Sequence, residues 1–139
     1  MAIARFRGFL MSLAAVWTVA GTGTGALRAH EAEEFEFFEK RIRPVMVERC
    51  QECHSARSAS LKGGLRVDGR EALLRGGDSG PAVLPGDAAG SLLFRAVGYE
   101  DPDLQMPPRS RLESTVVEDF RRWIAAGAPW PPETKPDRD

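Results

Sequence analysis

The chain has 139 residues, 42% hydrophobic and 28% charged, which is enough for one domain and suits a soluble globular protein. Residues 30–139 hold 16 basic and 20 acidic side chains, a net charge of −4, because the first 29 residues carry three arginines and no acid. A chain without a basic stripe offers no surface for a phosphate backbone, so nucleic acid is excluded as an expected partner.

Residues 1–29 have the layout of a secretory signal peptide. Two arginines precede an uncharged, mostly apolar run over residues 9–20, and small residues follow it. The run is shorter than the roughly 20 apolar residues of a membrane span. We therefore expect cleavage after Ala26 or Ala29 and export to the periplasm, with a retained N-terminal anchor as the alternative.

Apolar residues at helical spacing predict short helices separated by long loops. We expect helices over residues 33–49, 70–75, 91–98 and 114–126. Pro44 predicts a kink or a second short turn in the first of them. Ser91 is the expected N-cap of the third helix, and Ser114 or Thr115 of the last, where Thr115 and Glu118 fit a capping box.

The segments between these helices are rich in Gly, Ser, Pro and Asp, which favour turns. The expected fold is therefore an all-α domain of three to five short helices over residues 30–132, with long loops. Loops of this length are often functional, and here they would be reasonable if they wrapped a bulky cofactor. Residues 133–139 are expected to be a disordered tail or the start of a linker.

Both cysteines and one of the two histidines lie in "RCQECHSA", residues 49–56. A disulfide between Cys50 and Cys53 would close a very small loop and stabilise little. A structural zinc needs four ligands, and the only other histidine is His30. A thioredoxin-like pair expects a βαβ pattern that the sequence does not show, and a cysteine nucleophile leaves the second cysteine unexplained.

Covalent haem attachment uses all three residues of this C-x-x-C-H motif. Cys50 and Cys53 can each bond one vinyl group of a haem, and His54 then becomes the proximal ligand of the iron. Haem is attached in this way in exported proteins, which agrees with the predicted signal peptide. The cofactor also supplies apolar core to a domain of about 110 residues, which is small for building one from side chains alone.

Met106 is the expected distal ligand. It lies 52 residues after His54 in "LQMPPR", where two prolines hold the loop extended and present the thioether. Met46 lies one helical turn before Cys50 and cannot easily reach the other face of the ring. His30 is a distant second candidate.

Two other features have ordinary structural interpretations. The segment "GGDSGPA", residues 76–82, is similar to the surroundings of a trypsin-like serine, but no free histidine base accompanies it, so a tight turn is expected. Four aromatic residues are candidates for packing either around the ring or between the terminal helices: Phe38, Phe94, Phe120 and Trp123.

The chain resembles the planctomycete-type cytochrome c domain family over roughly residues 35–131. The matching blocks are "FFEKRIRPVMVERCQECHS", "KGGLRVDGREALLRGGDSGPAVLPGDAAGSLLFRAV", "QMPPR" and "FRRWIAAGAPWP". The resemblance implies one haem c, thioether bonds at Cys50 and Cys53, and iron ligands at His54 and Met106. Family members usually continue into larger exported proteins, so a free-standing carrier and a fragment both stay open.

The expected function is one-electron transfer by a carrier that is not itself an enzyme, serving an unidentified redox partner protein or domain. If Met106 does not bind iron, the open face would favour a peroxidase-like enzyme or a gas sensor. A third hypothesis is a haem module that accepts electrons from a larger exported enzyme. No membrane span is expected once the signal is cleaved.

Overall fold

The helices follow one another along the chain in the order that the apolar periodicity predicts. The computed structural model describes residues 23–132. Its elements are α1 (Gly23–Phe37), the π-helical turn η1 (Phe38–Ile42), α2 (Arg43–Arg49), the 3₁₀ turn η2 (Lys62–Gly64), α3 (Arg70–Arg75), α4 (Leu92–Gly98) and α5 (Ser114–Ala125). Within residues 23–132 there are two isolated β-bridges and no strand, so the all-α prediction is confirmed.

The first predicted helix is longer than expected and is interrupted. It begins at Gly23 rather than at residue 33. The sequence pattern did not predict these first turns, because residues 25–33 are exposed and form no apolar face. At η1 the N–H of Arg43 donates to the carbonyl of Phe38, five residues earlier. Pro44 then lies in the first turn of α2, where its missing N–H costs no helical hydrogen bond. The kink or second turn that Pro44 predicted is therefore replaced by a π-helical turn just before the proline.

Two of the predicted segments lie wholly or partly outside the described residues. The predicted signal peptide falls outside them up to residue 22, and its last residues form the start of α1. The predicted tail, residues 133–139, also lies outside them.

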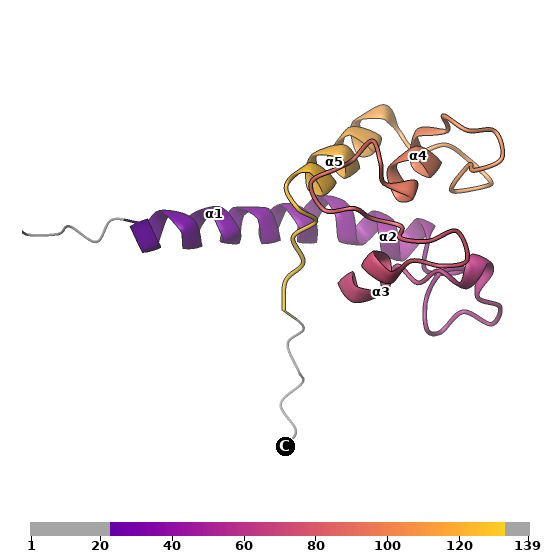
Figure 1. Ribbon diagram of the computed structural model, residues 1–139, viewed down its shortest axis with the longest axis horizontal. Coiled ribbons are helices and arrows are strands. Elements are labelled where there is room, and N and C mark those ends of the chain that lie inside the picture. Colours follow the sequence, from indigo (N-terminus) through magenta and orange to yellow (C-terminus); the bar gives the residue numbers. More distant parts are fainter. Residues whose placement is uncertain (1–22, 133–139) are drawn as a thin grey trace, which may run out of the picture.

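The core joins the two ends of the chain. α5 packs on η1, and α4 packs on α5, so the terminal segments cross beside the middle of the molecule (Figure 1). Phe38, Phe120 and Trp123 are fully buried, with ring centroids 5.7 Å apart for Phe38 and Trp123 and 6.3 Å apart for Phe120 and Trp123. Trp130 lies 4.4 Å from Phe38 and extends the cluster to the end of the described chain.

The predicted helix caps are only partly right. Ser91 does occupy the N-cap of α4, but its hydroxyl donates to the carbonyl of Asp87 at 2.7 Å instead of capping the helix. The N-cap of α5 is Glu113, which precedes both predicted residues, Ser114 and Thr115, and no side chain caps the helix. The capping box does not form, because Thr115 lies inside α5 and is not its N-cap, and Glu118 pairs with Arg121.

Candidate functional site

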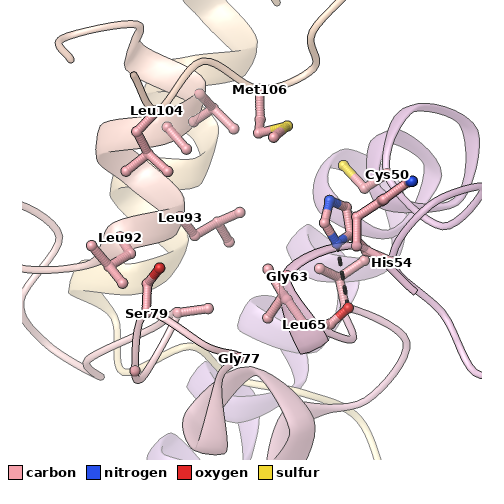
Figure 2. Close-up of a pocket in the computed structure, with 16 residues that line it drawn as sticks. Cys50, His54, Gly63, Leu65, Gly77, Ser79, Leu92, Leu93, Leu104 and Met106 are labelled. Carbon is pink, nitrogen blue, oxygen red and sulfur yellow. Dashed lines mark hydrogen bonds between the residues drawn. The ribbon is translucent and has the colours of Figure 1, made fainter. Parts of the chain in front are cut away.

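A cavity of about 190 Å³ opens between the segment after α2 and the segment that follows α4. Most of its wall is apolar, as Figure 2 shows for the leucines of α4 and the following loop. The lining residues come from five parts of the chain: Cys50, His54, Lys62, Gly63, Leu65, Val67, Gly77, Ser79, Gly80, Ala82, Leu92, Leu93, Ala96, Val97, Leu104 and Met106. Three of the four predicted site residues therefore meet at one cavity.

His54 is held in one orientation by the backbone. Its own N–H donates to the carbonyl of Cys50 at 3.0 Å, and its carbonyl accepts from the N–H of Val67 at 2.8 Å. The Nδ1 atom lies 3.3 Å from the carbonyl of Leu65, which places the ring proton on Nδ1 (Figure 2). The Nε2 atom then keeps its lone pair, as a metal-binding imidazole requires.

The two cysteines have different environments. Cys50 ends α2, lines the cavity and is half-buried, whereas Cys53 is exposed and faces a neighbouring surface hollow with Pro107 and Pro108. Burial raises the pKa of the Cys50 thiol to about 11, although nearby Arg49 opposes the shift. Both thiols are free, so this pair forms no disulfide.

Met106 faces the same cavity from a loop that several hydrogen bonds attach to α4 (Figure 2). Its N–H donates to the carbonyl of Ala96 at 3.0 Å. The Tyr99 hydroxyl donates to the carbonyl of Pro107, and Arg111 donates to the carbonyl of Gly98 at 2.8 Å. The loop thus presents the thioether toward His54 from another element.

Sequence reasoning did not identify Leu65 or Tyr99 as parts of this arrangement. Leu65 acts through its carbonyl, which leaves no mark in the sequence. Tyr99 is the one tyrosine of the chain and follows a helix directly before the Met106 loop, a signal that could have drawn attention to it.

The remaining candidate residues lie elsewhere. Met46 is 1% exposed in the core and does not line the cavity, in agreement with its rejection as a ligand. His30 is exposed on α1. None of the four aromatic candidates lines the cavity: Phe38, Phe120 and Trp123 pack between the terminal segments, and Phe94 is partly buried against the same core. The turn predicted over residues 76–82 is present, with a bridge between Gly77 and Gly80.

Residues 50–110 match a family model described as planctomycete cytochrome C. This segment belongs to the planctomycete cytochrome c family. It includes Cys50, Cys53, His54 and Met106, and therefore the whole of the predicted constellation. No curated protein and no solved structure matched the chain.

Membership of the planctomycete cytochrome c family implies covalently bound haem c and haem-based electron transfer. The residues present fit such a group, since an apolar cavity carries an oriented imidazole, a thiol beside it and a thioether on another element. Within residues 23–132, no three His, Cys, Asp or Glu side chains lie close enough together to hold a metal ion. No helix of this part of the chain has the length and hydropathy to cross a bilayer.

Proposed function

We propose that the protein is a c-type cytochrome that carries single electrons through one haem, tethered by Cys50 and Cys53 and ligated by His54 and Met106. The observation that carries this proposal is that His54 and Met106 line one apolar cavity from different elements, with Cys50 beside the imidazole. A haem iron with both axial positions filled by protein exchanges one electron and leaves no position open for a substrate.

The residues around the cavity would each have a separate task. The thiols of Cys50 and Cys53 fix the group to the chain, and the Leu65 carbonyl holds the imidazole in the tautomer that leaves Nε2 available. The Met106 loop supplies a neutral thioether, which raises the reduction potential relative to a second nitrogen ligand. The apolar wall excludes water, which further tunes the potential.

The site of action that we propose is the periplasm, after cleavage of the N-terminal signal. The partner would be a redox protein or domain that docks near the solvent-accessible side of the site, where Cys53 is exposed. The net charge of −4 over residues 30–139 favours a partner with a basic docking patch, through electrostatic steering.

Expression in a host that exports the chain and attaches haem tests the proposal. Intact mass should show one covalent haem on a processed chain, and the spectrum should show six-coordinate low-spin iron with a sulfur–iron charge-transfer band. A Met106→Ala variant should lose that band and bind carbon monoxide. The matched control is Met46→Leu, a volume-conserving change in the core that should keep the band.

Two results would contradict the proposal at different points. A colourless protein with the mass of the bare polypeptide would remove the haem altogether. A Met106→Ala spectrum identical to that of the unaltered protein would remove the distal ligand and favour an open-site enzyme or sensor.

A further inference from the structure

Two polar side chains in the wall of the cavity have no part in the ligation proposed above. Lys62 is the only charged side chain among the described lining residues, and Ser79 carries the only hydroxyl. Neither side chain forms an ion pair or a hydrogen bond with another residue of the described chain. Apart from Cys50, His54 and Met106, the rest of the wall is built from glycines and aliphatic residues.

A backbone contact brings these two side chains to the same part of the cavity. The N–H of Asp78 donates to the carbonyl of Gly63 at 2.8 Å, and Lys62 and Ser79 are the residues immediately outside this bonded pair. Figure 2 shows Gly63 and Ser79 on the side of the cavity away from Met106 in that view.

Glycine makes this approach possible. A Cβ added to Gly77 would lie 2.1 Å from the carbonyl oxygen of Gly63, a separation that no side chain tolerates. The same loop is attached to the C-x-x-C-H segment, because the N–H of Lys62 donates to the carbonyl of Cys53 at 3.2 Å. The glycine-rich segments around residues 63 and 77 therefore hold a short polar rim on an otherwise apolar cavity.

The chemistry of this rim matches one feature of the expected ligand. A haem is an apolar ring with two carboxylates, its propionates, and a carboxylate beside an apolar wall is costly unless it is hydrogen-bonded or paired with a cation. An ammonium and a hydroxyl are donors of the required kind, and the leucines on the other walls offer none.

We propose that Lys62 and Ser79 form the propionate-binding edge of the cavity, with the Lys62 ammonium paired to a carboxylate and the Ser79 hydroxyl donating to one. This assignment rests on the proposed function, because it places the carboxylate edge of the same haem. It gives a role to the "GGDSGPA" segment, which presents Ser79 to the cavity rather than acting as a nucleophile site.

The test uses the haem-loaded protein with Lys62→Met, Ser79→Ala and the matched control Lys40→Met. Lys40→Met removes the same charge from a lysine of η1 that does not line the cavity. The propionate bending band in the resonance Raman spectrum should shift in Lys62→Met and in Ser79→Ala but not in Lys40→Met. Lys62→Arg should restore the band, since it keeps a cationic donor.

The reduction potential provides a second readout. Loss of the Lys62 cation favours the ferric form, so the midpoint potential of Lys62→Met should fall, and the difference should shrink at high salt because Lys62 is exposed. An unchanged propionate band and potential in both cavity variants, in protein that still carries haem and the sulfur–iron band, would overturn this proposal alone. A protein without haem would instead overturn the proposed function.

Discussion

The hydroxyl of Tyr99 donates a hydrogen bond to the carbonyl of Pro107, the residue directly after Met106. Tyr99 also holds a left-handed backbone, with φ 58°, at the C-cap of α4. That conformation costs a non-glycine residue roughly 1–2 kcal/mol, so its persistence means that surrounding contacts outweigh the strain. One residue thus ends α4 and fastens the loop that carries the thioether.

Replacing Tyr99 with Phe tests whether this bond holds Met106 in place. The ring can stay under the Arg111 guanidinium, 5.7 Å away, so that only the hydroxyl is lost. We expect a loss of about 1 kcal/mol in the free energy of unfolding. The sulfur–iron charge-transfer band should disappear at a lower urea concentration than the helical circular dichroism signal does. Equal urea midpoints for the band in the variant and the unaltered protein would contradict the assigned role.

The buried thiol of Cys50 predicts unequal reactivity in the haem-free protein. The thiolate is the reactive form, and burial raises the pKa of Cys50 to about 11, so the thiol is almost entirely neutral at pH 8. Exposed Cys53 should therefore react faster with iodoacetamide, as tandem mass spectrometry of the labelled peptide can measure. In urea the two rates should become equal; a persistent difference there would point to local sequence rather than burial.

The same thiol gives the haem-free protein a dependence of stability on pH. The folded state keeps the proton of Cys50 up to about pH 11, whereas the unfolded chain releases it near the ordinary value of 9.0. Between those values the folded state binds more protons, so the free energy of unfolding should fall as the pH rises. Urea titrations at pH 8 and pH 10.5 measure this, with Cys50→Ala as the control in which this contribution is absent.

Gly77→Ala should disrupt the contact between the two loops beside the cavity. The new methyl group would meet the carbonyl of Gly63, which is backbone and cannot rotate away. We expect a loss of about 1–3 kcal/mol in the free energy of unfolding, typical of an overpacked site. Gly69→Ala is the matched control, because nothing lies within 4 Å of a Cβ there and its φ of −168° suits any residue. Equal urea midpoints for the two variants would refute the close approach.

A substitution in the aromatic cluster should lower the stability of the protein without changing the environment of the haem. Phe38→Ala should cost about 3–5 kcal/mol, because the ring is fully buried against Trp123 and Trp130. The haem absorption spectrum of the folded variant should not change, since Phe38 does not line the cavity. Leu84→Ala, at a side chain that is 39% exposed, should have a much smaller effect on unfolding. A shifted Soret band in Phe38→Ala would show that cluster and cavity are coupled.

The sequence predicted the helix bounds correctly where apolar periodicity or a glycine marked them. α3 has the predicted bounds, because Gly76 follows Arg75 with φ 74° and ends the helix. The start of α1 was missed, since its first turns are exposed and carry no apolar periodicity. The position of Ser91 at the N-cap was predicted, but its hydroxyl does not cap the helix. The hydroxyl instead donates to a carbonyl of the preceding turn, which sequence spacing does not reveal.

In the candidate site, the side chains at the cavity were predictable from the sequence, and the contacts that hold them in place were not. Cys50, His54 and Met106 were predicted from residue type and spacing, and the structure places them on one cavity. The contacts of Leu65, Tyr99 and the loops around Gly63 and Gly77 were not predictable, because each depends on segments brought together by folding. In each of these contacts the acceptor is a backbone carbonyl, which every residue carries and which therefore gives no signal in the sequence.

The exposed first turns of α1 bear on the proposed cleavage of the N-terminal segment. Residues 25–33 are exposed, and this part of the helix extends away from the rest of the domain (Figure 1). A helical segment without tertiary support is marginally stable in water, so its backbone opens at little cost. The peptide bonds after Ala26 and Ala29 are then accessible to a protease while the domain beyond them stays folded. The cleavage proposed above and the folding of the domain could therefore proceed in either order.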